Sequence, residues 1–203
     1  MKIALFGATG NVGSRIVAEA LRRGHEVTAI ARHPEKLKPH PKLTLQPGDV
    51  NNQSDVAKFS PGHDAVISSV KFRLIQPRIL LAGVAQAKVK RLLVVGGAGT
   101  LEVAPGVQLL DAPGFPEAYK PEALGGRAFL SLLRAENKLE WTFLCPSAEF
   151  APGPRTGKFR IGGDQLLTGA DGKSWISMED FAIAMIDELE NPRHVRERFT
   201  VGY

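Results

Sequence analysis

Short apolar runs alternate along the chain with segments in which apolar residues recur every three or four positions. The runs have the length of buried β-strands, and the periodic segments have the pattern of amphipathic helices. We predict strands over residues 3–6, 26–31, 43–46, 64–68, 91–95, 141–145 and 198–201. Because strands and helices alternate, the pattern predicts an α/β fold on a parallel, doubly wound sheet.

The helical periodicity predicts four helices. The first ends near Arg23, with Gly24 in the position that terminates a helix, and two more cover 77–88 and 122–138. The last ends before Asn191-Pro192 and starts at Ser177-Met-Glu-Asp180, which has the spacing of a capping box. The positions that carry the periodicity are Val12, Ile16, Val17, Ala20 and Leu21 in the first helix, Leu124, Ala128, Leu132 and Ala135 in the third, and Phe181, Ala184, Met185 and Leu189 in the last.

A glycine-rich turn joins the first strand to the first helix. Gly7, Gly10 and Gly13 stand three residues apart in it. Gly7 suits a tight turn, Gly10 lets the backbone approach a bound phosphate, and Gly13 lets the helix pack closely on the strand. The first amides of a helix lack partners and carry the positive end of its dipole. The turn therefore predicts an anion site, although an ordinary strand-turn-helix is the alternative.

The composition is that of a globular domain with a sizeable core. Apolar residues make up 43% and charged residues 23% of the 203 positions, so we expect one α/β domain over residues 1–203. Residues 96–121 contain four prolines and are predicted to be irregular, and residues 151–173 turn to glycine, proline and polar types. We expect substrate-side elements at about 98–121 and 147–175, the second forming short strands of a small C-terminal lobe.

Charge and hydropathy limit the location and the partners. No apolar run reaches the roughly 18 residues that a membrane span needs, and a strand at residue 3 leaves no room for a signal peptide. We therefore expect a cytoplasmic protein with no membrane partner. The net charge of +5 comes from scattered lysines and arginines, without the basic, aromatic stripe typical of nucleic-acid binding. A polyanionic cofactor would account for part of the excess.

The sequence offers little for metal or thiol chemistry. Cys145 is the single cysteine, which excludes an internal disulfide framework and a cysteine-rich metal site. It ends an apolar strand, so we interpret it as a small buried hydrophobe. The five histidines show no ligand spacing, and no metal is predicted.

Arg32 follows the second strand, about twenty positions beyond the glycine turn. NAD-preferring sites carry Asp or Glu there for the ribose 2′-hydroxyl. A guanidinium would instead bind a 2′-phosphate through charge-assisted hydrogen bonds, and His33 and Lys36 would add to that pocket. We therefore predict a preference for NADP(H) over NAD(H), with a plain surface arginine as the alternative.

Other polar residues stand where strands end. Asp49 follows the third strand and would accept a hydrogen bond from an adenine amino group or cap the turn. Ser68 and Ser69 end the fourth strand, at the edge where ligands collect in open α/β sheets. Apolar residues of 98–121 would cover an acceptor or pack on the domain. Glu149 and Asp164 lie in the region that would face substrate, without an assigned catalytic role.

Together these motifs resemble the atypical short-chain dehydrogenase/reductase family. The residues are Gly7-Ala-Thr-Gly-Asn-Val-Gly13, Arg32, Gly48-Asp49-Val50, Asp64-Ala-Val-Ile67, Pro146-Ser147 and Ile176-Ser-Met-Glu-Asp-Phe-Ala182. The chain is most similar to the compact NAD(P)H-binding branch that includes proposed NADH-flavin reductases, biliverdin/flavin reductases and NmrA-like relatives. The likeness covers nearly the whole chain.

The resemblance implies a six- or seven-stranded Rossmann sheet with the cofactor across its strand ends. By position, Gly7, Thr9, Gly10, Asn11 and Val12 would hold the pyrophosphate, and Arg32 the 2′-phosphate. Asp49 and Val50 would flank adenine, and Ser68 and Ser69 would approach the ribose. Pro146 and Ser147 would sit beside the nicotinamide, near Gly96 at the end of the fifth strand.

The chain departs from the family at its proton relay. The family carries a tyrosine followed four positions later by a lysine, with a serine after the fifth strand. Here Ala123 stands four positions after Tyr119, Gly96-Gly97 ends the strand, and the other tyrosine is the last residue, Tyr203. An electron-poor ring does not need that acid, because it accepts hydride at a ring atom and takes its proton from solvent.

Two functions of different classes follow. The first is an NAD(P)H-dependent reductase of flavins such as FMN or FAD, of quinones or of similar planar acceptors, acting as a monomer or homodimer. The second is a redox-sensing regulator that binds dinucleotide without turnover, as NmrA-like relatives are thought to do. A nucleotide-sugar epimerase or dehydratase is disfavoured by the missing relay. The sequence assigns no catalytic residue.

Overall fold

The computed structural model describes residues 1–203 and is built on one eight-stranded sheet. The strand order is β10-β12-β8-β5-β4-β1-β2-β3, and every neighbouring pair is parallel except β10 with β12. The strands are β1 (Lys2–Phe6), β2 (Glu26–Ala31), β3 (Leu43–Pro47), β4 (Ala65–Ser68), β5 (Arg91–Val95), β8 (Glu140–Cys145), β10 (Arg160–Gly162) and β12 (Glu197–Gly202). The predicted α/β, doubly wound sheet is confirmed, although it has eight strands where the family resemblance implied six or seven.

The chain reverses its direction of travel across the sheet next to β1. It places β2 and β3 on one side of β1, and then β4, β5 and β8 on the other. Open α/β sheets bind ligands beyond the carboxyl ends of the strands at such a reversal. The glycine turn between β1 and the first helix lies at this point.

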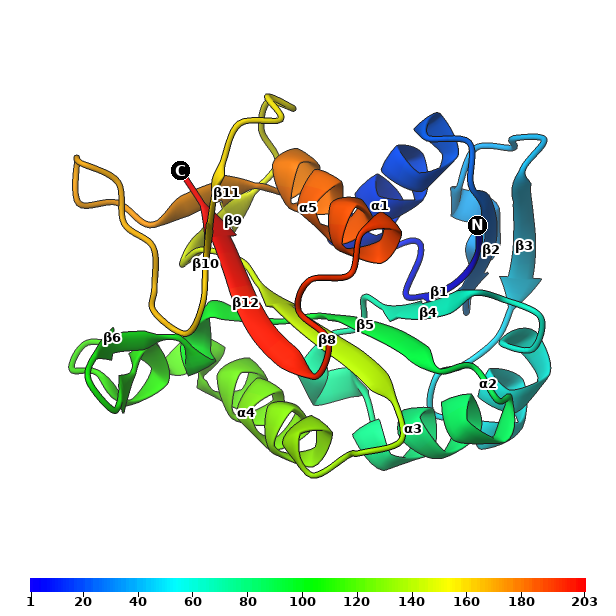
Figure 1. Cartoon of the computed structure of the whole chain (residues 1–203), viewed down its shortest axis with the longest axis horizontal. Coiled ribbons are helices and arrows are strands. Elements are labelled where there is room, and N and C mark those ends of the chain that lie inside the picture. Colours follow the sequence, from blue (N-terminus) through cyan, green and yellow to red (C-terminus); the bar gives the residue numbers. More distant parts are fainter.

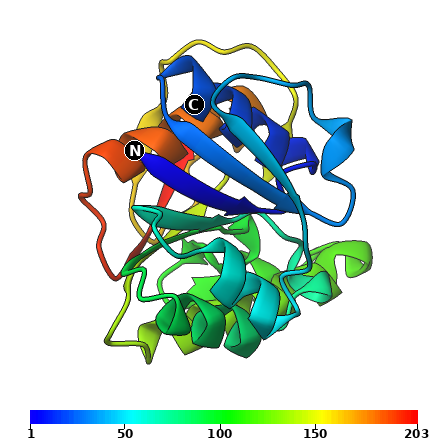
Figure 2. The same ribbon diagram turned by 90° about the vertical axis from the view of Figure 1, so that its right-hand side faces the viewer.

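Five α-helices cover the two faces of the sheet (Figures 1 and 2). Figure 1 shows α1 and α5 on one face and α2, α3 and α4 on the other. Each layer closes over its own apolar core, one around Ile16 and Phe181, the other around Leu80 and Phe129. The helices are α1 (Asn11–Arg22), α2 (Gln53–Phe59), α3 (Pro77–Gln86), α4 (Lys120–Arg134) and α5 (Met178–Glu190). None of them combines the length and apolar character that crossing a membrane requires.

The buried face of α4 differs from the periodicity that predicted the helix. Leu124 is 51% exposed, whereas Phe129 and Leu130 are buried. The helix also packs against Phe72 through Gly125 and Gly126, where a Cβ atom would lie within 3 Å of the Phe72 side chain. Glycine provides the close contact on the buried face of α4. A pattern built on leucine and alanine therefore predicts the wrong face of the helix to be buried.

The prolines of residues 96–121 do not exclude regular structure, contrary to the prediction. A hairpin of β6 (Glu102–Ala104) and β7 (Val107–Gln108) forms there, joined through Pro105 and Gly106. Gly106 has a φ of +74°, and proline followed by a left-handed glycine is the signature of a type II turn. Three 3₁₀ turns complete the segment: η3 (Ala98–Thr100), η4 (Leu109–Asp111) and η5 (Glu117–Tyr119). Two further 3₁₀ turns are η1 (Pro34–Lys36) and η2 (Phe72–Leu74).

The expected short strands after residue 147 form, but they divide between two sheets. β9 (Glu149–Ala151) pairs with β11 (Trp175–Ser177) in a separate two-stranded parallel sheet, whereas β10 extends the main sheet. Asp164, considered above as a residue facing substrate, instead pairs with the buried Arg198 of β12. Arg198 also donates to the Thr100 carbonyl, so this pair fastens the C-terminal segment to η3.

Ser177 caps α5, but the reciprocal half of the capping box is missing. Its hydroxyl accepts from the Asp180 amide at 3.0 Å. The Asp180 carboxylate instead accepts from the amides of Thr156 and Gly157, at 2.7 and 3.0 Å, and from the Tyr203 phenol at 2.8 Å. Asp180 therefore holds the loop after β9 and the last residue, and Tyr203 is committed to structure.

Candidate cofactor site and the adjoining pocket

Two of the three motif glycines are required by the fold itself. Gly7 has a φ of +80°, and a Cβ there would lie 2.3 Å from the Ser69 carbonyl oxygen. A Cβ at Gly13 would lie 2.1 Å from the Gly7 carbonyl oxygen. Side chains at either position would collide with backbone, so both glycines fix the approach of α1 to β1 and β4.

Gly10 is less constrained by the fold, because a Cβ there would require a shift of only a few tenths of an ångström in its neighbour. Its φ is −72°, which any residue adopts, and a Cβ at this position would have the Gly7 carbonyl oxygen as its nearest neighbour, at 3.3 Å. Gly10 is also the N-cap of α1, which has no side-chain cap and no acidic residue in its first turn. The first amides of α1 therefore have no side-chain partner, as an anion site at a helix N-terminus requires.

A pocket of about 480 Å³ opens beside this turn, at the carboxyl ends of β1, β2 and β4. Of the residues predicted from the sequence, those that line it together are Gly7, Thr9, Gly10, Arg32, His33, Lys36, Asp49, Val50 and Ser69. Its ionisable lining is four potentially cationic side chains, with Lys71 as the fourth, and one carboxylate. The pocket thus suits a polyanion.

Arg32 stands immediately after β2, exposed at the pocket wall. No acidic side chain pairs with its guanidinium, whereas the neighbouring His33 ring lies 3.4 Å from the Glu35 carboxylate. An unpaired guanidinium loses no internal partner when it binds an anion. This placement fits a 2′-phosphate.

Asp49 caps its turn, which is one of the two roles predicted for it; the other is a hydrogen bond to adenine. One carboxylate oxygen accepts from the Asn51 amide at 2.9 Å, while the residue still lines the pocket. The Asn51 side chain donates to the Leu74 carbonyl and accepts from the Gln76 amide, each at 2.7 Å. Asn51 therefore fastens the loop after β4 to the loop after β3.

The remaining predicted site residues do not line this pocket. Asn11 is exposed and Val12 half-buried at the start of α1, and Ser68 is 1% exposed. Gly96 packs its Cα against the β8 backbone, since a Cβ there would lie 2.7 Å from the Leu144 oxygen. Pro146 is buried, and the buried Ser147 hydroxyl donates to the Val201 carbonyl at 3.0 Å.

A second pocket, of about 380 Å³, lies at the carboxyl ends of β5 and β8, beside the start of α4. Gly97 and Ala148 contribute from the two strand ends, and Leu109, Phe115 and Tyr119 from the segment after η3. Because β4 lies between β1 and β5, this apolar pocket continues the crevice that begins at the glycine turn.

The loop after β4 separates the two pockets. Val70 and Lys71 line the first, whereas Phe72 lines the second. The Glu122 carboxylate of α4 accepts from the Phe72 amide at 2.7 Å and from the Arg73 amide at 3.1 Å. The Phe72 ring stacks on Phe143 at a centroid distance of 5.7 Å.

Sequence reasoning missed this loop and its supports. Lys71 could have been predicted from its position near the end of a strand, because it follows Ser69 by two residues. Asn51, Phe72 and Glu122 carry no sequence signal, since their roles arise from contacts between elements far apart in the chain.

Cys145 is fully buried at the end of β8, as expected. Burial raises the pKa of its thiol to about 12, so it is not a nucleophile. No group of three or more His, Cys, Asp or Glu side chains is arranged to hold a metal ion.

The sheet order, the turn and the basic pocket define a Rossmann-type dinucleotide-binding protein. The model of the NAD(P)H-binding family matches residues 7–192, and the chain belongs to this family. The resemblance to atypical short-chain dehydrogenases/reductases is thereby confirmed.

Relatives span the whole chain. The uncharacterized protein YwnB of Bacillus subtilis is 41% identical over 212 aligned positions, which cover 99% of this chain and 98% of YwnB. Among solved structures, a Bacteroides thetaiotaomicron protein proposed as an epimerase is 44% identical with a TM-score of 0.95, covering 100% and 96% of the two chains. A Streptococcus pneumoniae protein proposed as an NADH-flavin reductase is 36% identical with a TM-score of 0.87, covering 100% and 99%.

Proposed function

We propose that the protein is an NAD(P)H-dependent oxidoreductase that prefers NADPH and reduces flavins, quinones or similar planar acceptors. The observation that carries this proposal is the N-terminus of α1 at Gly10, which has no side-chain cap and lines the basic pocket. The four potentially cationic side chains of the first pocket support a cofactor with an additional phosphate. The proposed NADH-flavin reductase of Streptococcus pneumoniae supports the acceptor class.

The residues present fit such a cofactor. The amides at the start of α1 would hold the pyrophosphate, and Arg32 with Lys36 would hold the 2′-phosphate. When bound, the dihydronicotinamide supplies a hydride to the acceptor, which takes its proton from water. The apolar pocket would orient the acceptor and exclude bulk water, and orientation alone can lower a barrier by roughly 7–11 kcal/mol.

No residue is placed to act as the family's tyrosine and lysine relay. Tyr119 lines the apolar pocket, but Ala123 stands in the lysine position and the neighbouring Lys120 pairs with Glu117. Tyr203 donates to Asp180 of α5 and does not line the apolar pocket. An acceptor that takes hydride at an electron-poor ring atom dispenses with that relay.

Steady-state oxidation of NADPH tests the proposal. The purified protein is mixed with NADPH and a panel of riboflavin, FMN, menadione and benzoquinone, and the absorbance of the reduced cofactor is followed. We expect acceptor-dependent loss of NADPH, with a lower KM for NADPH than for NADH. Tight NADPH binding with no turnover on any acceptor would contradict the proposal that the protein is an enzyme.

That outcome would favour the second candidate, a redox-sensing regulator. The missing relay is the observation that favours it, because a sensor must bind its dinucleotide without consuming it. Retrieval of a protein partner whose binding changes between NADP⁺ and NADPH would then distinguish the sensor. The cytoplasmic location stays a prediction that cell fractionation would test.

A further inference from the structure

The two pockets of the crevice differ sharply in charge. Residues that line the apolar pocket include no lysine, arginine or histidine, whereas the cofactor pocket has four such side chains. The ionisable lining of the apolar pocket is Tyr119 and two carboxylates, Glu122 and Glu149. Glu149 is exposed in β9, and its carboxylate has no ion-pair partner.

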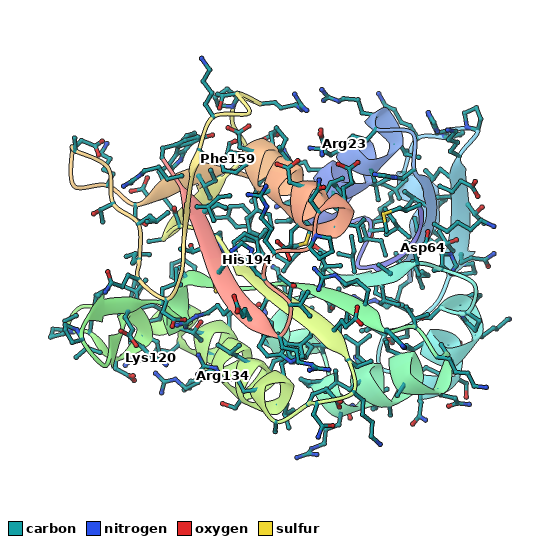
Figure 3. The ribbon with its side chains drawn as sticks, viewed as in Figure 1. Arg23, Asp64, Lys120, Arg134, Phe159 and His194 are labelled. Atoms are coloured by element: carbon teal, nitrogen blue, oxygen red, sulfur yellow. The ribbon has the colours of Figure 1, made fainter.

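Of the cations around this pocket, Lys71 and Arg73 flank Phe72 without lining the pocket, and the following three are already engaged. Lys120, at the start of α4 (Figure 3), pairs with Glu117. Arg127, two turns further along α4, donates to Gln108 at 2.8 Å and pairs with Asp111. Arg198 lies buried beneath Thr100 and pairs with Asp164. None of these three is free to neutralise an anion in the pocket.

Two polar side chains of the lining, Thr100 and Glu122, are also satisfied internally. The Thr100 hydroxyl is 3.5 Å from the Gly97 carbonyl oxygen that accepts from it, and the Glu122 carboxylate accepts from two backbone amides. A phosphate entering here would lose its water and gain no side-chain donor other than the Tyr119 hydroxyl, which is costly. It would also approach the exposed Glu149 carboxylate, and like charges repel.

Resting on the proposed function, we infer that the acceptor is a neutral planar ring, such as a quinone or a flavin without a phosphate, and not FMN or FAD. The two pockets of the crevice differ in charge and therefore bind different ligands, the cofactor and the acceptor. The polyanionic cofactor binds at the basic end, and an uncharged ring binds between Phe72, Leu109, Phe115 and Tyr119. The volume of about 380 Å³ lies within the range of small-molecule sites.

Riboflavin and FMN give a matched test, because they share one ring and differ by one phosphate. We expect kcat/KM with NADPH to be about tenfold or more higher for riboflavin than for FMN at low salt. The ratio should narrow as salt screens the repulsion. Glu149→Lys should lower the ratio by raising kcat/KM for FMN. Glu26→Lys, the same charge change at the opposite edge of the sheet, should leave the ratio unchanged.

Equal or higher kcat/KM for FMN would overturn the inference and leave the reductase standing. Absence of turnover would overturn the reductase, and the inference would then be decided by binding. Titration of the NADP⁺-loaded protein into each flavin, followed by quenching of flavin fluorescence, should show tighter binding of riboflavin than of FMN. Equal or tighter binding of FMN, or failure to bind riboflavin, would overturn the inference.

Discussion

Single residues of the glycine turn serve either the fold or the ligand, and substitutions can separate the two roles. Gly10→Ala places a methyl group 3.3 Å from the nearest oxygen, so the loss of stability should be smaller than that of a substitution at Gly13. The methyl group would occupy the space over the α1 amides, and we expect NADPH affinity to fall at least about tenfold, or ~1.4 kcal/mol. Calorimetric titration and thermal unfolding measure the two effects.

Gly13→Ala is the matched control, because its methyl group would lie 2.1 Å from the Gly7 oxygen. We expect it to destabilise the protein by about 1–3 kcal/mol, the usual cost of overpacking. A Gly10→Ala variant that unfolds as readily as Gly13→Ala while binding NADPH normally would reverse the assignment.

The charge of Arg32 makes a separate prediction about the cofactor. Arg32→Ala should weaken NADPH binding by about 1.5–3 kcal/mol, the range for hydrogen bonds to charged groups, or roughly tenfold to a hundredfold. NADH, which lacks the 2′-phosphate, should bind almost unchanged. Titration of both cofactors checks this, and equal losses for the two would show that Arg32 does not contact the phosphate.

For single residues, the local sequence predicts those positions that the backbone geometry of a turn or strand end requires. Gly7 and Gly13 are identifiable because a strand, a turn and a helix follow one another within fourteen residues. Arg32 is identifiable because it ends the adjacent strand. Ser147 shows the limit of such reasoning: it stands at a strand end by sequence, but its hydroxyl bonds to Val201, a contact between distant segments.

The loop after β4 is the element on which both pockets depend. Glu122 holds the amides of Phe72 and Arg73 on its two carboxylate oxygens, so Glu122→Gln keeps one weaker acceptor and puts an NH2 donor against the other amide. We expect the KM for menadione to rise severalfold, with a smaller change in the Kd of NADPH, because Phe72 faces the acceptor side.

The control for Glu122→Gln is Glu117→Gln, which removes an exposed carboxylate from the adjacent 3₁₀ turn outside the pocket lining. It should leave both constants within error. An unchanged menadione KM in Glu122→Gln would show that the loop holds its position without the carboxylate. Restoration of the KM by Glu122→Asp would support a positioning role.

The elements that the sequence predicts best are those buried on both faces. The central strands read as continuous apolar runs, and their observed bounds agree to within a residue or so. The short helix α2 was not predicted, because its seven residues carry one fully buried apolar position, Val56. Its usable signal is the Asn52 N-cap, which accepts from the Ser54 amide at 3.0 Å.

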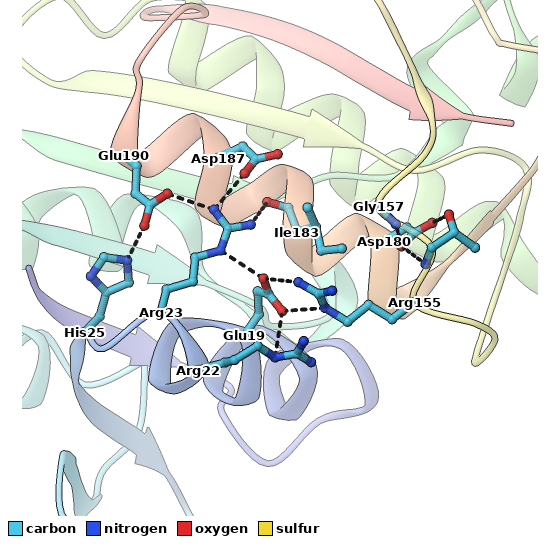
Figure 4. Close-up of polar contacts among 11 residues, drawn as sticks. Glu19, Arg22, Arg23, His25, Arg155, Gly157, Asp180, Ile183, Asp187 and Glu190 are labelled. Atoms are coloured by element: carbon cyan, nitrogen blue, oxygen red, sulfur yellow. Dashed lines mark hydrogen bonds and ion pairs between the residues drawn. The ribbon is translucent and has the colours of Figure 1, made fainter.

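On the scale of the whole molecule, an ion-pair network fastens the C-terminal half to the first helix (Figure 4). The buried Glu19 of α1 accepts two hydrogen bonds of 2.9 Å from Arg155, in the loop after β9, and one from Arg23. Arg23 in turn bonds Asp187 and Glu190 of α5. Residues more than 130 positions apart are therefore joined through one carboxylate. No local pattern in the sequence predicts this contact.

This network predicts how stability depends on pH. The hydrogen bonds from Arg155, with those from Arg23, lower the pKa of Glu19 to about 2, against roughly 4.3 in an unfolded chain. A carboxyl group with a lowered folded pKa stabilises the protein fully above the unfolded pKa. That contribution is lost as the pH falls toward the folded pKa. Glu19 should therefore contribute its full stabilisation above about pH 5 and lose it between about pH 5 and 2.

Since Arg155 reaches solvent, we expect the contribution to be on the order of 2 kcal/mol, below the full value of the shift. Urea unfolding of the wild type and Glu19→Gln at a series of pH values measures it. The difference between the two should be largest near neutral pH and shrink as the solution is acidified. Glu26→Gln, at an exposed carboxylate without an ion pair, should show no such trend. A Glu19→Gln difference that is independent of pH would mean that Glu19 acts through packing and not through its charge.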